Sequence, residues 1–289
     1  MNPWFDFDSK WNLQPLPSAA EPVFMLGAIW RSGTTLVQRL LCSDPQLFLW
    51  GEPYGDAGIL PHLHQSAKAL LRPGWPTSNH FLIPETELTE IVMEAPQKHW
   101  IANLYPEPAA IRNSYRSMLD TLFQQSAITL GRTRFGIKEI RYDGHVAQFL
   151  QWLYPDARFV FLMRNPYDAW SSYKGSQWYY QYPKMLVKDV QVFAKLWKKN
   201  FESFLMFRQD PSAKYMFFED LLQNPEENIS ILEEHCRVSI DRETLSFRIR
   251  GMQKQAMPVT KREEEIIRKI CKSLAESCGY FGPKDTQRS

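Results

Sequence analysis

The sequence has only four cysteines in 289 residues, and none of them belongs to a Cys-x-x-Cys pair. They are Cys42, Cys236, Cys271 and Cys278. A structural zinc site needs more closely spaced ligand pairs than these. We therefore expect reduced thiols packed into the fold, and no metal site.

Long apolar runs are also missing. Nowhere does the chain offer the roughly 20 consecutive apolar residues that a membrane helix needs. The stretch from Met1 to Pro17 is aromatic and acidic, and it lacks the basic start and apolar run of a signal peptide. We expect a soluble, cytoplasmic protein with no membrane span.

A strong charge of one sign is the third absence. The formal net charge is +2, which is too small for a protein that coats nucleic acid. Any anion must therefore be bound by locally placed Lys and Arg side chains. Hydrophobic residues make up 44% of the chain, enough for a large core, so we expect one folded domain over residues 1–289.

Apolar strands alternate with amphipathic helices along the chain. The pattern predicts strands at residues 22–26, 135–140, 158–163 and 214–218, and helices at 34–42, 145–153, 187–207 and 260–277 and after Pro166. It indicates an α/β fold of three layers, with a central parallel sheet flanked by helices. Residues 1–20 form an N-terminal extension, and proline-rich residues 54–134 are expected to be helices and loops within the same domain.

A loop typical of an anion site follows the first predicted strand. Residues 31–36 read Arg-Ser-Gly-Thr-Thr-Leu and open a helix, whose N–H groups and dipole attract anions. Gly33 allows close backbone approach, Thr34 and Thr35 can donate hydrogen bonds, and Arg31 adds a charged planar donor. A Walker A loop would place Lys directly after its last Gly, whereas Thr34 stands there.

A second anion site is predicted from residue 164 onward. Arg164 ends a strand, Pro166 fits the first turn of the next helix, and Ser172 lies two turns into that helix. The strand end and the helix start bring Arg164 and Ser172 toward one face. Two such motifs in this order make coincidence an unsatisfactory explanation.

Together the two motifs resemble those of sulfotransferases that use 3′-phosphoadenosine 5′-phosphosulfate (PAPS). Residues 31–36 are similar to the 5′-phosphosulfate loop of tyrosylprotein and many bacterial enzymes, although Trp30 replaces the usual Pro. Arg164 and Ser172 match the 3′-phosphate motif. The resemblance implies a P-loop nucleotide-hydrolase-like fold, PAPS as co-substrate and no metal. The PAPS-binding residues that it implies are Arg31, Ser32, Gly33, Thr34, Thr35, Arg164, Ser172, Phe218 and Lys254.

Two further segments extend the resemblance. The segment beginning Phe-Phe218-Glu-Asp-Leu is similar to the family's Tyr-Glu-Asp-Leu segment, whose aromatic residue packs near the adenine. Phe218 keeps the stacking but not the hydroxyl, and a core position explains it equally well. Arg248, Arg250 and Lys254 lie where family members place basic residues that close over the nucleotide; solvated surface charge is the alternative.

The proton acceptor also follows from the resemblance. Phenol sulfotransferases use a His two residues after a Lys, but Lys138 is followed by Glu139 and Ile140. Tyrosylprotein-type enzymes use a Glu in a Gly-Glu context, which Trp-Gly-Glu52-Pro matches. We expect Glu52 to be the general base, with a pKa raised by partial burial; Glu139 and His145 are the alternatives.

Lys138 resembles the family's lysine beside the reacting sulfuryl group. With Arg31 it would neutralise charge that gathers on the leaving phosphate and the sulfuryl oxygens. The alternative is an ordinary strand-end Lys that pairs with its neighbour Glu139. The resemblance thus implies that Glu52, Arg31 and Lys138 are catalytic.

The sequence therefore predicts a sulfotransferase that moves a sulfuryl group from PAPS to an acceptor hydroxyl and releases adenosine 3′,5′-bisphosphate. A P-loop-type kinase or other phosphoryl transferase, and a non-catalytic nucleotide-binding scaffold, remain as alternatives. Without a predicted membrane anchor, a bacterial cytoplasmic enzyme fits better than a Golgi one.

The acceptor stays open among carbohydrate, peptide tyrosine, lipid and small natural product. Residues 54–134 are expected to form much of its site. An aromatic stretch could stack on a ring of the acceptor, or could equally be core and surface packing. Its members are Tyr167, Trp170, Tyr173, Trp178, Tyr179, Tyr180 and Tyr182.

Overall fold

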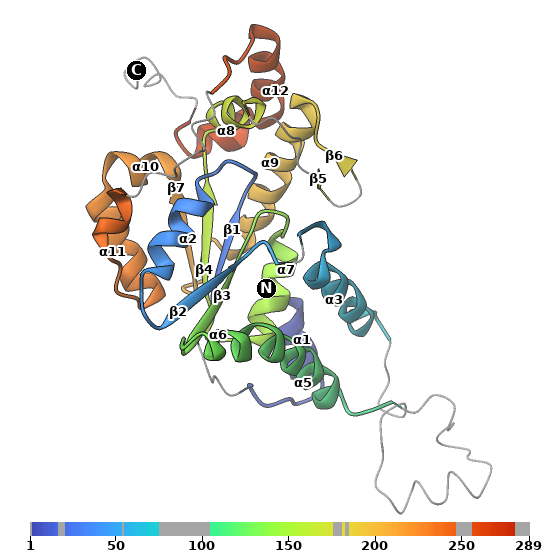
Figure 1. The fold of residues 1–289 in the computed structure, drawn as a ribbon. Helices are drawn as coiled ribbons and strands as arrows, with labels where there is room; N and C mark the ends of the chain where they lie inside the picture. The colour runs from blue at the N-terminus through green and yellow to red at the C-terminus, as the bar shows by residue number, and fades with distance from the viewer. Residues whose placement is uncertain are drawn as a thin grey trace, which may run out of the picture.

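The computed structural model describes residues 2–16, 21–53, 55–74, 105–175, 181–182, 185–246 and 256–280. Its centre is a five-stranded parallel sheet with the strand order β2-β3-β1-β4-β7 (Figure 1). The strands are β1 (Val23–Gly27), β2 (Leu47–Gly51), β3 (Arg134–Glu139), β4 (Arg158–Met163) and β7 (Ala213–Phe217). The parallel sheet and four of its strands are confirmed, whereas β2 was not predicted from the sequence.

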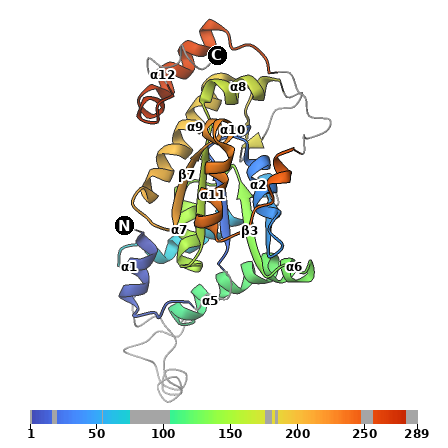
Figure 2. The same ribbon diagram turned by 90° about the vertical axis from the view of Figure 1, so that its left-hand side faces the viewer.

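Alternate residues of the sheet enter two separate cores. On β1, Phe24 and Leu26 join one hydrophobic cluster, and Val23 and Met25 join the other. The helices packed in the first cluster include α1 (Pro3–Lys10), α7 (Gly144–Leu153) and α9 (Val190–Phe204). The opposite face of the sheet is covered by α2 (Thr34–Cys42), α10 (Phe218–Gln223) and α11 (Pro225–Cys236) (Figures 1 and 2). The predicted three-layer arrangement is therefore confirmed.

The helix starts agree with the capping residues in the sequence. Asp143 caps α7, and Asp189 caps α9, which explains why α9 begins later than predicted. Thr260 and Glu263 form a capping box at the start of α12 (Lys261–Ser277). In α8 (Pro166–Lys174), proline occupies the first turn as expected. Figure 1 shows α8 and α12 together above the sheet, where α12 also packs on α9.

The N-terminal segment is part of the core, since its helix α1 buries Trp4 and Phe7. Asp8 accepts hydrogen bonds from Trp152 Nε1 at 2.7 Å and from Arg112 Nη1 at 2.6 Å. These contacts attach α1 to α7 and to α5 (Pro108–Leu119). The sequence pattern did not reveal this helix, because its buried side chains meet partners more than a hundred residues away.

The segment between β2 and β3 is helical, as expected, where the structure describes it. It contains short 3-10 turns at Gly55–Ala57 and Lys68–Leu71, α3 (Ile59–Ala67), α5, a π-helical turn at Asp120–Gln124 and α6 (Gln125–Thr129). Residues 75–104 lie outside the described residues. Trp50 Nε1 donates to Phe123 O at 3.1 Å, so the π turn holds the end of β2.

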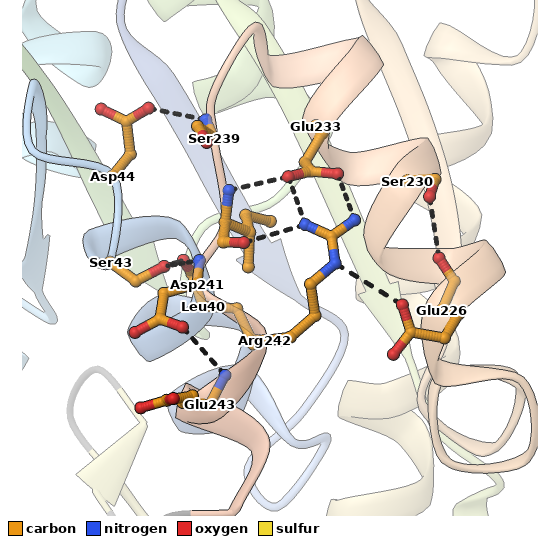
Figure 3. A network of polar contacts seen from close by, with 11 residues as sticks. Leu40, Ser43, Asp44, Glu226, Ser230, Glu233, Ser239, Asp241, Arg242 and Glu243 are labelled. Carbon is orange, nitrogen blue, oxygen red and sulfur yellow. Dashed lines mark hydrogen bonds and ion pairs between the residues drawn. The ribbon is translucent and has the colours of Figure 1, made fainter.

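A polar network joins α11 to the end of α2 (Figure 3). Arg242 donates to both carboxylate oxygens of Glu233, each at 2.6 Å. Asp44 Oδ2 accepts from Ser239 N at 2.7 Å, and Ser43 Oγ accepts from Asp241 N at 2.9 Å. The network fixes the far end of α2, whose start lies beside the predicted anion loop.

All four cysteines are unpaired thiols, two of them buried and two partly buried. None of the helices that the structure describes has the length and apolar character of a membrane span. Within the described ranges, no three His, Cys, Asp or Glu residues gather closely enough to hold a metal ion.

Candidate active site at the carboxyl edge of the sheet

A cleft of about 340 Å³ runs along the carboxyl edge of the sheet, the edge at which parallel α/β folds bind ligands. Each strand supplies a residue to it. Glu52 follows β2, Lys138 lies on β3, Arg31 follows β1, Arg164 follows β4 and Phe218 follows β7. Because β2 and β3 lie on one side of β1 and β4 and β7 on the other, the cleft has two ends. We call Glu52 and Lys138 the carboxylate end, and Arg31, Arg164, Phe218 and the start of α2 the arginine end.

The start of α2 opens toward the cleft. Gly33 occupies the N-cap position with a φ of 83°, and no side chain among the described residues caps the helix. Thr34 and Thr35 also line the cleft. Because the first N–H groups of a helix have no partner within it, they are available to an anion here.

The loop before α2 is held in a strained conformation. Arg31 has a φ of 67°, which non-glycine residues rarely adopt. Ser32 is buried and its hydroxyl donates to Ile29 O at 2.7 Å, so this side chain shapes the loop and does not line the cleft. Asn200 Nδ2 donates to Ala28 O at 2.9 Å and fixes the loop from α9. Strain of this kind persists only where surrounding contacts impose it.

The two predicted anion motifs meet in the structure. Arg31 Nε donates to Ser172 Oγ at 3.0 Å, and Arg164 Nη1 donates to Arg31 O at 2.8 Å. Burial lowers the pKa of Arg164, opposed by Asp168 and Glu219, and the guanidinium stays charged. Arg164 Nε is buried and has no hydrogen-bond partner among the described residues. An orphaned charged donor beside an uncapped helix suits a ligand that is an anion.

Phe218 lies in the cleft and not in the core. Its ring centroid is 4.8 Å from the Arg164 guanidinium carbon. The ring also covers Gly33, because a Cβ at that glycine would lie 2.0 Å from the ring edge. The core position of Phe218 therefore does not agree with the structure, and its stacking on adenine stays a prediction.

The carboxylate end is an ion-paired cluster. Lys138 Nζ donates to Glu52 Oε1, and Arg141 Nη1 donates to Glu52 Oε2 at 2.9 Å. Glu52 has a φ of 43°, and its backbone N–H donates to Lys138 O at 2.7 Å. Both the backbone and the side chain of Glu52 are therefore held against β3.

The predicted rise in the pKa of Glu52 is wrong. Burial raises the pKa of this carboxyl, but Lys138 and then Arg141 outweigh burial and the pKa ends below its usual value. The sequence shows the residues that flank Glu52 but not the two cations, which come from β3 and the turn after it. Glu52 is consequently ionised at neutral pH.

The alternatives for Lys138 and for the base do not agree with the structure. Lys138 pairs with Glu52 and not with Glu139, because adjacent residues of a strand point to opposite faces. Glu139 is fully buried and bonds Arg141 at 3.0 Å. His145 is exposed at the start of α7, and neither it nor Glu139 lines the cleft.

Two residues of the site were not predicted, Arg141 and Glu219. Glu219 Oε1 accepts from Asn165 N at 2.9 Å and its Oε2 accepts from the Tyr280 hydroxyl at 3.0 Å, which fixes the turn after Arg164. Both lie just beyond the carboxyl end of a strand. That position, in a predicted parallel sheet, was the signal that could have identified them.

Some predicted residues cannot be placed or are placed elsewhere. Lys254, Arg248 and Arg250 lie outside the described residues, as do Trp178, Tyr179 and Tyr180. Trp170 and Tyr173 are buried in the core, where Trp170 Nε1 donates to Glu263 at 2.9 Å and the Tyr173 hydroxyl donates to Val187 O at 2.6 Å. These two rings are therefore packing residues and not an acceptor platform.

A family model described as "Sulfotransferase family" matches residues 22–242. No curated protein gives a significant match. Among solved structures, the chain is similar to the sulfotransferase domain of the Synechococcus PCC 7002 olefin synthase, at 18% identity and a TM-score of 0.51, with 93% of this chain and 98% of that one covered. This likeness shows that the fold is the P-loop-like α/β fold of sulfotransferases.

Two other similar structures are the sulfotransferase domain from the curacin biosynthetic pathway (16% identity, TM-score 0.49, 93% and 100% covered) and a mouse sulfotransferase complexed with PAP (9% identity, TM-score 0.44, 96% and 92% covered). The family model spans most of the chain, including β1, the anion loop, Glu52, Lys138 and Arg164. The protein belongs to the sulfotransferase family.

Proposed function

We propose that this sulfotransferase moves a sulfuryl group from PAPS to an acceptor hydroxyl and releases adenosine 3′,5′-bisphosphate. The observation that carries the proposal is the composition of one cleft. It combines an uncapped helix start, two contacting arginines, a lysine and a carboxylate along the carboxyl edge of the sheet. A helix start with free N–H groups beside a second guanidinium, that of Arg164, suits a nucleotide that carries phosphate at both its 5′ and 3′ positions.

The arginine end would bind the nucleotide. The N–H groups at the start of α2, with Thr34, Thr35 and Arg31, would hold the 5′-phosphosulfate. Arg164 and Ser172 would hold the 3′-phosphate, and Phe218 would stack on the adenine. Ser32 and Lys254 stay predictions, since Ser32 points into the loop and Lys254 lies outside the described residues.

The carboxylate end would carry out the proton transfer. The acceptor oxygen bonds to sulfur as the bond from sulfur to the phosphate oxygen breaks, and the hydroxyl proton passes to the Glu52 carboxylate. Lys138 and Arg31 neutralise charge on the sulfuryl and phosphate oxygens. Because Lys138 also lowers the pKa of Glu52, a shift of Lys138 toward the sulfuryl oxygens would raise that pKa when the base is needed.

The proposal is tested by incubating the protein with PAPS labelled in the sulfuryl group and a panel of hydroxyl compounds. The panel contains sugars, phenols, tyrosine peptides, lipids and small alcohols. We expect label in at least one acceptor, without added divalent metal. A parallel melting experiment should show stabilisation by adenosine 3′,5′-bisphosphate alone. Stabilisation only by ATP with Mg²⁺ would contradict the proposal and support a phosphoryl transferase.

A further inference from the structure

Glu139 is a fully buried carboxyl group beside the candidate active site, and the proposed chemistry gives it no role. Its Oε1 accepts from Ile140 N at 2.8 Å, Arg141 N at 3.2 Å and Arg141 Nη1 at 3.0 Å. Its Oε2 is buried and has no partner among the described residues. A buried carboxylate is costly unless it is paired, and Arg141 is the cation that pairs with Glu139.

Arg141 joins that buried carboxyl to Glu52. The same nitrogen, Nη1, donates to Glu52 Oε2 at 2.9 Å and to Glu139 Oε1 at 3.0 Å. The Arg141 guanidinium carbon lies 5.9 Å from the Trp30 ring centroid, and its side chain is only 10% exposed. Arg141 is not among the residues that line the cleft, although it contacts Glu52, which is.

The two oxygens of Glu52 therefore have different partners. Oε1 faces Lys138, which also lines the cleft and would turn to the sulfuryl group. Oε2 faces Arg141, which is held in place by Glu139. When Lys138 changes partner, Arg141 is the group that still fixes the carboxylate.

We propose that Arg141 is a positioning residue, anchored by Glu139, that holds Glu52 in place and sets its ionisation while Lys138 engages the sulfuryl group. This inference rests on the proposed function, in which Glu52 is the base. A purely structural ion pair would stabilise the fold without controlling the protonation of Glu52. The two roles differ in whether the pKa of Glu52 changes when the charge of Arg141 or of Glu139 is removed.

The charges around this pair determine the signs of the expected shifts. Lys138 and Arg141 lower the pKa of Glu52 against burial, and Arg31 and Arg164 share its cleft. Burial raises the pKa of Glu139 to about 7, with Glu52 adding to the rise and Arg141 and the Ile140 N–H opposing it. The buried Tyr142 hydroxyl is a further titratable group that interacts with Glu139.

The test is a pH titration of the glutamate side chains, labelled with ¹³C at the carboxyl carbon and followed by NMR. The Glu52 signal is assigned by its absence in Glu52→Gln. In Arg141→Gln, which removes the cation, we expect the pKa of Glu52 to rise by about one pH unit. In Glu139→Gln the side-chain oxygen can still accept from Arg141 Nη1 while the competing negative charge is gone, so we expect the pKa of Glu52 to fall or to stay low. Arg141→Lys keeps a charge and should restore part of the wild-type value.

The double variant Arg141→Gln/Glu139→Gln protects the test against simple misfolding, because it leaves no unpaired buried charge at these two positions. Its Glu52 pKa should lie between those of the two single variants. If Arg141→Gln lowers only the melting temperature and leaves the Glu52 titration unchanged, or if both single variants shift it in the same direction, the inference is overturned.

Binding of adenosine 3′,5′-bisphosphate by calorimetry separates this inference from the proposed function. Arg141 and Glu139 lie outside the arginine end, so all of these variants should bind the bisphosphate as the wild type does. Absence of binding in the wild type contradicts the proposed function, whereas the Glu52 titration can be measured independently of it.

Discussion

The two ends of the cleft differ in how their charges are held. At the arginine end, Arg31 and Arg164 contact each other through a backbone carbonyl and leave donors that face the cleft or lack partners among the described residues. At the carboxylate end, Lys138 and Arg141 already occupy both oxygens of Glu52. One end leaves donors open to an anion, and the other is a closed network that changes partners in the proposed mechanism. Substitutions at the two ends should therefore separate affinity from turnover.

The largest effect is expected from Glu52→Gln, which keeps the shape of the side chain but cannot accept the proton. Turnover should fall by roughly 10²–10⁴-fold, the usual contribution of a general base. Bisphosphate affinity should stay near the wild-type value, because Glu52 is at the carboxylate end. Rates with labelled PAPS and calorimetry measure the two quantities. A fully active variant would contradict the assignment of Glu52 as the base.

Arg164→Ala probes the arginine end. Loss of a charged hydrogen-bonding group costs about 1.5–3 kcal/mol, so the bisphosphate should bind roughly 10–100-fold more weakly. Adenosine 5′-phosphate, which lacks the 3′-phosphate, should bind almost as well as it does to the wild type. Equal losses for both nucleotides would refute the assignment of Arg164 to the 3′ site.

Gly33→Ala tests the backbone of the same end. The left-handed conformation costs alanine about 1–2 kcal/mol, and the new Cβ must also displace the Phe218 ring, so we expect bisphosphate affinity to drop at least about tenfold. Gly131→Ala is the matched control, because Gly131 has a φ of 75° but no described atom lies within 4 Å of the position that its Cβ would take. If both variants bind the bisphosphate equally well, the contact between Gly33 and Phe218 has no role in binding.

The smallest effect is expected from Ser172→Ala, which removes the acceptor for Arg31 Nε. A single hydrogen bond contributes about 0.5–1.5 kcal/mol, so bisphosphate affinity should fall by roughly 2–10-fold. Ser171→Ala is the control on the same helix, because the Ser171 hydroxyl donates instead to Met257 O at 2.7 Å. An equal loss in the control would show that both changes act through the helix and not through Arg31.

The sequence signals for the arginine end are local. Arg31, Gly33 and Arg164 each stand at a strand–helix junction, where neighbouring residues determine the backbone geometry. Proline at the start of α8 and threonine before α12 likewise mark helix starts without reference to distant contacts. The parallel sheet followed from the same alternation of strands and helices.

The carboxylate end depends on contacts that no local pattern contains. Glu52 meets Lys138 across 86 residues and Arg141 across 89, so neither the pairing nor the sign of its pKa shift could be predicted from its neighbours. The same reason applies to α1, whose Trp4 stacks on Trp152 in α7.

The most direct test of the account is a calorimetric titration of the unmodified protein with adenosine 3′,5′-bisphosphate in the absence of divalent metal. We predict saturable binding of one nucleotide per chain, weakened by salt because the contacts are ionic. No detectable binding over the accessible concentration range, by calorimetry and by thermal melting alike, would contradict the claim that the arginine end binds a doubly phosphorylated adenosine.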